Sequence, residues 1–248
     1  MRIGPTASAL PAGVAAALTA AALALPPTAP AAAAATAATA ATPGAGAAAA
    51  AGVVSPPDAY SAALRTAIAD LPVAGEQRAG YQRALFPHWV DADRDGCHTR
   101  NEVLIAESIT PPAVAPPCAV SGATWYSYYD DATWTVGGDV DIDHVVPLAE
   151  AWDSGAHAWT TALRREYAND LADPRSLVAV TDNVNQAKAD QDPATWLPPY
   201  PPARCRYLGE FVATKVRWRL SVDPAERDAL VANGDDCPNE VISTAYAY

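Results

Sequence analysis

Apolar and acidic residues alternate along one short run of the chain, DVDIDHVVPL. Side chains alternate between the two faces of a strand, so the first valine and the isoleucine are expected to point toward a core while Asp141 and Asp143 point the other way. Pro147 cannot donate to a sheet ladder and is expected to end the strand. Carboxylates on one face, with a histidine at the strand end, predict a chemical site at this position.

The same alternation predicts a partner for this strand. Apolar residues over 176–181 indicate a second strand, and residues 182–188 are expected to begin a helix capped by Thr181 or Asp182. The insert between the two strands, residues 148–173, is expected to be mostly helical. We therefore expect an α+β domain with a small hairpin-helix core that is surrounded by helices and stabilised by disulfides.

Other segments are predicted from their periodicity and from their turn residues. Aromatic residues over 123–136 predict two short strands that turn near Asp130 and Asp131, and the prolines of 111–117 predict an extended connector. Apolar residues at helical spacing predict helices over 63–71, 81–90 and 207–220. A capping box at Asp223 and Glu226 predicts a further helix, which Gly234 is expected to end.

The first residues have the composition of a secretory signal peptide. Arg2 precedes an apolar run over 9–25, and small residues with A-x-A spacing follow. An uncleaved membrane anchor is the alternative, but the alanine content and Pro11 make this run a poor anchor. We expect a signal peptide over residues 1–35, a disordered Ala-rich tether over 36–55, and one domain over 56–248. The mature protein is expected to be secreted, monomeric and without stable membrane association.

The charge of the chain restricts how it can meet nucleic acid. A formal net charge of -12 argues against broad electrostatic attraction to phosphate, so any such contact must be local. Basic residues near the end of the chain supply either one positive face or an ordinary solvated helix face. These residues are Arg204, Arg206, Lys215, Arg217 and Arg219.

The chain has four cysteines, and none of them stands in a C-x-x-C pair. In an exported chain this indicates two disulfides rather than a metal site. Sequence permits three connectivities. The pairing Cys97–Cys118 with Cys205–Cys237 is favoured because each bond closes a local loop.

Residues 91–102, DADRDGCHTRNE, match the spacing of an EF-hand calcium loop. The alternative is an acidic turn in which aspartates bind their own backbone, and His98 stands where an apolar residue usually packs. Arg100 is a candidate phosphate contact. The possible calcium ligands are Asp91, Asp93, Asp95, the carbonyl of Cys97, and Glu102.

The run DIDHVVP at residues 141–147 resembles the first strand of the HNH, or His-Me finger, endonucleases. In that family a β-hairpin and a following helix form a ββα-metal core. Residues 182–188 match the start of that helix. The beginning of the insert 148–173, together with the segment DQDPATWLP over 190–198, resembles secreted bacterial members of the family. Those members are related to the C-terminal nuclease domain of modification-dependent restriction enzymes, and the resemblance covers roughly residues 91–237.

The resemblance implies a role for each matching residue. Asp143 would hold a divalent metal, His144 would be the general base, and Lys188 would contact a phosphate. Asn185 would be the metal ligand from the helix, with Asn183 as its competitor. Oxygen ligands and the absence of a second histidine on the helix point to Mg²⁺ or Mn²⁺.

One position departs from the family pattern. Ser176 stands where a middle asparagine orients the catalytic loop, and Asn169 is the candidate to replace it. The resemblance implies a secreted, metal-dependent endonuclease that acts on nucleic acid, with DNA as the first candidate. The rival hypothesis is a non-catalytic, calcium-stabilised extracellular binding module. A metallopeptidase is not supported because no H-E-x-x-H motif occurs, and His88, His98 and His157 have no expected role.

Overall fold

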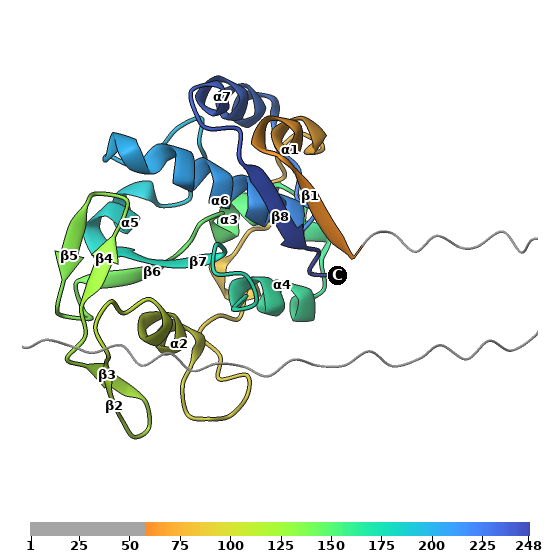
Figure 1. Ribbon diagram of the computed structural model, residues 1–248. Helices are drawn as coiled ribbons and strands as arrows, with labels where there is room; N and C mark the ends of the chain where they lie inside the picture. Colours follow the sequence, from red (N-terminus) through yellow and green to blue (C-terminus); the bar gives the residue numbers. More distant parts are fainter. Residues whose placement is uncertain (1–57) are drawn as a thin grey trace, which may run out of the picture. The chain divides into compact units, whose positions relative to one another are not determined.

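The computed structural model describes residues 58–248. The expected signal peptide, 1–35, and the expected tether, 36–55, lie outside these residues. Within the described part, helices are mixed with small antiparallel sheets, as the α+β prediction requires (Figure 1). None of the helices over 58–248 has the length and apolarity needed to cross a membrane.

The strands form four antiparallel pairs, and each pair is a separate two-stranded sheet. The predicted hairpin is present, and so is the aromatic strand pair. The pairing of the first strand with the last was not predicted, because the two are separated by most of the domain. The pairs are β1 (Ala59–Ala63) with β8 (Val241–Ala245), β2 (Ala113–Ala115) with β3 (Ala119–Ser121), β4 (Trp125–Ser127) with β5 (Ala132–Trp134), and β6 (Val140–His144) with β7 (Leu177–Thr181).

Most helices lie where the spacing predicts them, and the insert between β6 and β7 is helical. The capping box is formed, since Asp223 accepts from the backbone of Glu226 and Glu226 accepts from that of Asp223. The helices are α1 (Leu64–Asp70), α2 (Thr99–Ala106), α3 (Leu148–Asp153), α4 (Thr161–Ala168), α5 (Asp182–Lys188), α6 (Arg204–Arg217) and α7 (Pro224–Asp235), with 3-10 turns η1 (Arg83–Leu85), η2 (Ala156–Ala158) and η3 (Pro201–Ala203).

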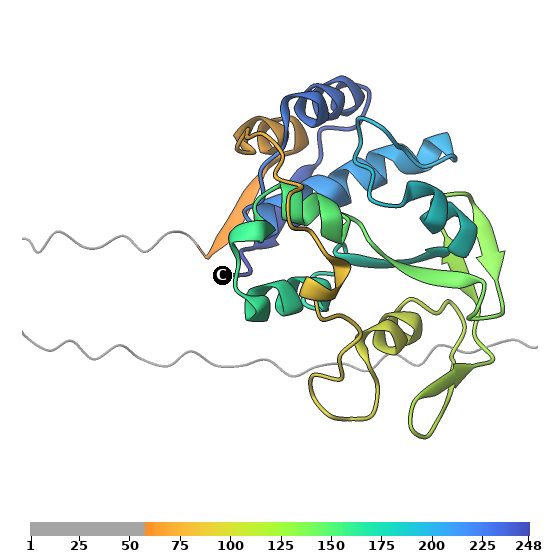
Figure 2. The same ribbon diagram turned by 180° about the vertical axis from the view of Figure 1, so that it is seen from behind.

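The prediction of a helix over 81–90 is wrong. This segment contains only the short turn η1 and is otherwise irregular. Pro87 interrupts the hydrogen-bond ladder of any such helix, and Trp89 has a positive φ of 56°. The connector between α1 and α2 instead runs past α3 and α4 (Figure 2), where Arg78 and Leu85 make hydrogen bonds to these helices.

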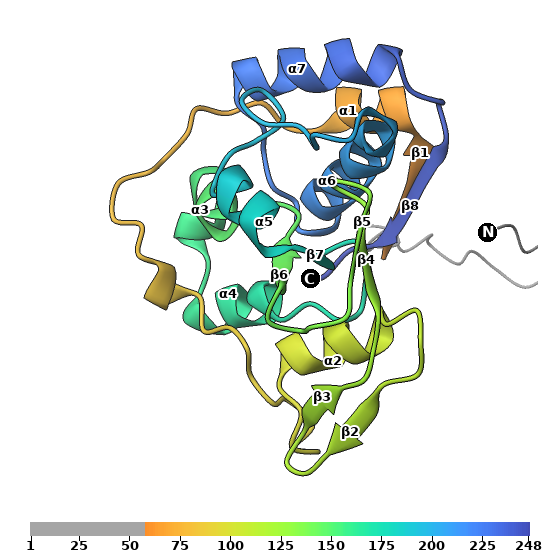
Figure 3. The same cartoon turned by 90° about the vertical axis from the view of Figure 1, so that its left-hand side faces the viewer.

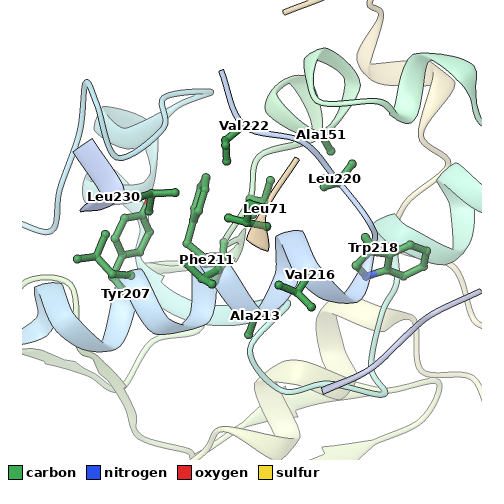
Figure 4. Close-up of a cluster of buried hydrophobic side chains, with 14 of the residues drawn as sticks. Leu71, Ala151, Tyr207, Phe211, Ala213, Val216, Trp218, Leu220, Val222 and Leu230 are labelled. Carbon is green, nitrogen blue, oxygen red and sulfur yellow. The ribbon is translucent and has the colours of Figure 1, made fainter. Parts of the chain in front are cut away.

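The main apolar cluster is built around α6. Tyr207 and Phe211 are fully buried on this helix, and Leu71, Val222 and Leu230 pack around it from α1, α7 and their flanking segments (Figure 4). The hydrophobic effect at these buried side chains holds α1, α6 and α7 together.

A second, smaller apolar cluster lies on the other face of the β6–β7 hairpin. Val178 and Val180 of β7 belong to the main cluster, whereas Leu177 and Ala179 belong to the second one, with Trp125. Successive strand residues point to opposite faces, so this hairpin is buried on both sides. Figure 3 shows α2 on one side of the hairpin and α5 on the other.

Both favoured disulfides are present, Cys97–Cys118 and Cys205–Cys237. The first bond joins the loop before α2 to the β2–β3 hairpin. The second joins the first turn of α6 to the segment that follows α7. Each therefore constrains a peripheral segment against an element that packs on the core.

Candidate active site

Helix α5 lies directly against the β6–β7 hairpin and binds both of its inward carboxylates. In the antiparallel register Asp141 is opposite Val180, and Asp143 is opposite Val178. Asn185 donates from Nδ2 to Asp141 Oδ2 at 3.2 Å, and Lys188 donates from Nζ to Asp143 Oδ1 at 2.9 Å. Because Asn185 and Lys188 are three residues apart on one helix, they meet carboxylates that are two apart on one strand face.

Asp143 is buried and held by two donors. The Tyr129 hydroxyl donates to Oδ2 at 2.7 Å, and Lys188 Nζ lies 2.9 Å from Oδ1 and 2.8 Å from Oδ2. Burial raises the pKa of Asp143 and lowers the pKa of Lys188, while the attraction between the two charges opposes both shifts. The carboxylate is thus fixed in one orientation, with its Oδ1 accepting only Lys188 among residues 58–248.

Lys188 does not occupy the position of a phosphate contact. Its side chain is fully buried, and its ammonium also donates to the carbonyl of His144 at 3.0 Å. An ammonium that is enclosed and saturated by Asp143 and a carbonyl has no face left for a substrate. The position of Lys188 does not support the predicted phosphate contact, and here the side chain orients Asp143 and the end of β6.

His144 contacts two aromatic rings, and one of its ring nitrogens is bound. Its ring stacks on Trp89 at 5.5 Å and on Tyr167 at 6.4 Å between centroids. Its Nε2 lies 3.0 Å from the carbonyl of Ala168. A carbonyl only accepts, so Nε2 carries the proton and Nδ1 presents a lone pair. Burial lowers the pKa of His144 to about 3, which keeps the ring neutral at neutral pH.

Asn169 anchors the segment that carries this carbonyl. Its Oδ1 accepts from Thr99 Oγ1 at 2.8 Å and from Val90 N at 3.1 Å, and its Nδ2 donates to the Pro87 carbonyl at 2.8 Å. These bonds fix the position of Asn169. They therefore also fix the neighbouring carbonyl of Ala168, which accepts from His144. Ser176, in contrast, donates to Asp170 and does not bind the histidine.

Asp143, His144 and Asn185 line one cavity of about 370 Å³. Asn183, the competitor for the ligand role, is exposed on another side of α5 and does not line it. The Oδ1 of Asn185 accepts no hydrogen bond within the described chain, so a carboxylate oxygen and an amide oxygen are both available at one wall. Two protein oxygens fit Mg²⁺ or Mn²⁺, which are often held by few protein ligands together with water and phosphate.

Arg83 also lines this cavity, although no sequence pattern indicates it. It comes from η1, is exposed, and forms no ion pair with any residue of 58–248. Its positive charge lowers the pKa of both His144 and Asp143, which places it close to them. No local motif marks it, since it lies far upstream of the hairpin in a segment that resembles a helix in sequence.

Arg100 lies elsewhere. Its guanidinium donates to the carbonyls of Gly137 at 3.0 Å and Val140 at 2.8 Å, and it does not line the cavity of His144. It attaches α2 to the start of β6. The predicted phosphate contact is therefore not supported by its position.

Asp141 is a supporting carboxylate. Burial and the neighbouring Asp182 raise its pKa, while the hydrogen bond from Asn185 lowers it. Asp141 does not line the cavity, but it binds Asn185, which does.

The acidic loop has features of both interpretations. Asp91 accepts from the backbone of Arg94 and Gly96, as an acidic turn requires. Oxygens of Asp91, Asp93 and Asp95 also lie within 4.8 Å of one another. Burial and these three carboxylates raise the pKa of Glu102, whose Oε2 is buried without a hydrogen-bond partner. The residues fit a calcium ion, and the disulfide of Cys97 leaves its carbonyl in place.

The late basic residues do not form one positive stripe. Lys215 and Arg217 are buried in ion pairs, and Arg206 binds Glu210. Arg204 donates to a carbonyl, and Arg219 lies over Tyr246. Most of these charges thus bind other groups of the fold. The hypothesis that they form one positive face for DNA along α6 and the residues after it is wrong.

The remaining histidines take no part in the cavity. His88 and His157 each place Nδ1 against a backbone carbonyl, and His98 caps α2. None of the three lines the cavity of His144.

Known proteins resemble this chain over the same region. Residues 118–233 match the family model described as "GmrSD restriction endonucleases, C-terminal domain". The chain is 44% identical over 187 residues to a protein of Arthroderma benhamiae described as an uncharacterized secreted protein, and the match covers 75% of this chain and 90% of that protein. No solved structure matches. The family match contains β6, β7 and α5, whereas Arg83 and the acidic loop precede it.

Proposed function

Because the chain belongs to the family of the Arthroderma benhamiae protein and contains a GmrSD C-terminal domain, we propose that it is a secreted, metal-dependent endonuclease. One observation carries the proposal. His144, whose Nε2 is bound to Ala168 and whose Nδ1 has no partner within residues 58–248, lines the same cavity as Asp143, Asn185 and Arg83.

His144 is the general base in this proposal. Its Nε2 is bound to Ala168, so the ring can take a proton from water on Nδ1 without turning. The imidazolium formed in this way keeps its hydrogen bond to the carbonyl. The rings of Trp89 and Tyr167 and the bond network of Asn169 hold the base in one orientation during the transfer.

Asp143 and Asn185 would hold Mg²⁺ or Mn²⁺. Such an ion supplies charge stabilisation to a phosphodiester that is attacked and to its leaving oxygen. Lys188 and Tyr129 keep the Asp143 carboxylate turned toward this position. Arg83 supplies the positive charge for a phosphate oxygen, the role that the resemblance assigned to Lys188.

The loop of residues 91–102 is proposed as a calcium site that stabilises the segment between η1 and α2. The unpartnered Oε2 of Glu102 beside three aspartates supports it. This feature alone would also suit the rival, a non-catalytic extracellular module. Nuclease assays separate the two.

The test is cleavage of nucleic acid by purified protein. Plasmid DNA, single-stranded DNA and RNA are incubated with millimolar Mg²⁺ or Mn²⁺, and His144→Ala is expected to reduce the rate by about 10²–10⁴-fold. His157→Ala is the matched control, because that ring also binds a carbonyl but lies outside the cavity. Equal cleavage by His144→Ala and the wild type, or none by any protein, would contradict the proposal.

A further inference from the structure

Five carboxylates from distant parts of the chain meet beside α6. Oxygens of Glu76, Glu150 and Asp192 lie within 4.8 Å of one another, and so do those of Asp192, Asp223 and Glu226. Asp192 belongs to both groups and joins them into one carboxylate cluster. The cluster draws on the connector after α1, on α3, on the segment after α5, and on the start of α7.

The cluster lies largely inside the protein. Glu150, Asp192 and Glu226 are 3%, 8% and 1% exposed, Asp223 is half-buried, and Glu76 is exposed. Carboxylates taken out of water repel one another strongly unless positive charge is placed between them.

One ammonium is present and does not balance this charge. Lys215 forms ion pairs with Glu150 at 2.6 Å and Glu226 at 2.9 Å, and within residues 58–248 no other ion pair involves the five carboxylates. Lys215 thus contacts two of the five acids, and Glu76, Asp192 and Asp223 form no ion pair within residues 58–248.

Lys215 has no hydrogen left for the cluster. An ammonium has three hydrogens. Lys215 already lies within hydrogen-bond distance of four acceptors: Glu150 Oε1 at 2.6 Å, Ser154 Oγ at 2.6 Å, the Ser221 carbonyl at 2.8 Å and Glu226 Oε2 at 3.1 Å. The Oε1 of Glu226 is close to the same ammonium, yet it accepts no hydrogen bond in the described chain and is shielded from solvent.

The other members also present free oxygens. Asp192 uses Oδ1 to accept from the backbone of Ala194 and Thr195, and Asp223 uses Oδ1 to accept from Ala225 and Glu226. The Oδ2 atom of Asp192 accepts no hydrogen bond over 58–248, and Asp223 shares a side-chain hydrogen bond with Glu76. The backbone bonds thus fix each carboxylate through one oxygen and leave the second oxygen for the cluster.

We propose that Glu76, Glu150, Asp192, Asp223 and Glu226 bind a calcium ion. All donors are oxygens, and calcium accepts six to eight oxygen ligands in irregular arrangements. Magnesium demands a stricter octahedron and keeps several waters, and no histidine or cysteine is present to favour a transition metal.

The ion would join three segments that border the candidate active site. Ala149 and Asp190 line the cavity of His144, and Glu150 and Asp192 follow them closely in sequence. Calcium at the cluster would therefore hold both cavity walls in place without contacting the substrate. It is separate from the acidic loop of residues 91–102 and independent of the proposed nuclease activity.

Calcium binding by the full chain tests this inference. Protein stripped with EGTA is titrated with calcium chloride by calorimetry, and its melting temperature is recorded with and without calcium. Glu102→Gln removes a ligand of the acidic loop, and this variant is expected to keep one bound calcium and a calcium-dependent rise in melting temperature. Asp192→Asn in the Glu102→Gln background is expected to abolish both.

Glu76→Gln provides a second variant, which is expected to fold as the wild type does because Glu76 is exposed. Combined with Glu102→Gln, it is expected to weaken the remaining calcium site by about tenfold or more, since affinity follows the number of charged ligands. If Glu102→Gln alone abolishes all calcium binding, or if Asp192→Asn and Glu76→Gln leave the affinity unchanged, the inference is overturned. The cluster then carries protons in place of an ion.

Discussion

Lys188 Nζ lies 2.8 Å from Asp143 Oδ2, and the two side chains are 0% and 6% exposed. This ion pair joins the last turn of α5 to the fourth residue of β6. A buried carboxylate is a poor metal ligand if it can turn away or take up a proton, and Lys188 opposes both. Lys188 thus keeps Asp143 oriented and ionised for the proposed metal ion.

Lys188→Met is expected to destabilise the protein by about 3–5 kcal/mol, because it leaves Asp143 buried and unpaired. Urea unfolding measures the change. Adding Asp143→Asn to the variant is expected to recover part of this loss, since no lone buried charge then remains. A Lys188→Met protein with wild-type stability and greatly reduced cleavage would instead support the original phosphate-contacting role.

Arg83→Gln is expected to reduce cleavage by about 10–100-fold and to leave the melting temperature unchanged, because Arg83 is exposed and unpaired at the cavity. The salt dependence of substrate binding is expected to become weaker in this variant. Arg165→Gln is the matched control, since Arg165 is an exposed arginine of α4 outside this cavity. An equal loss of activity in both variants would show that general surface charge is responsible.

Sequence predicted the hairpin-helix core because its signals are local. The alternation around Asp143, the strand at 176–181 and the spacing of Asn185 and Lys188 each follow from a few adjacent residues. The position of Arg83 and the meeting of five carboxylates beside α6 depend on contacts between segments far apart in the chain. The periodicity of a sequence does not predict such contacts. For Lys188, the helix face was predicted correctly, but the residue that its side chain contacts was not.

The two asparagines of α5 form a natural pair of test and control. Asn185→Ala is expected to lower cleavage by about tenfold or more and to raise the Mg²⁺ concentration needed for half-maximal rate, because it removes one of two protein oxygens. Asn183→Ala is expected to behave as wild type, since Asn183 is exposed and outside the cavity. Metal titration of the cleavage rate distinguishes the two, and the reverse ranking would make Asn183 the ligand.

Glu107 provides a pH dependence that is unrelated to the active site. Its Oε2 accepts from the backbone of Ala179 in β7 at 2.8 Å, and burial raises its pKa from 4.5 to about 7 in spite of that bond. The folded state therefore binds this proton more tightly than the unfolded state does. The contribution of Glu107 to stability is greatest below pH 4.5 and is lost as the pH rises through about 7.

Glu107→Gln keeps an oxygen for Ala179 but cannot ionise. We expect it to be more stable than the wild type at pH 8, by at most about 3 kcal/mol, and to show no gain at pH 4. Urea unfolding at both pH values measures the free energy of unfolding of each protein. Because the other acids titrate alike in both proteins, their effect cancels in the difference. Glu107→Ala is the control, because it loses the hydrogen bond to β7 and is expected to gain less at pH 8 than Glu107→Gln. A constant difference between Glu107→Gln and the wild type at the two pH values would contradict the raised pKa.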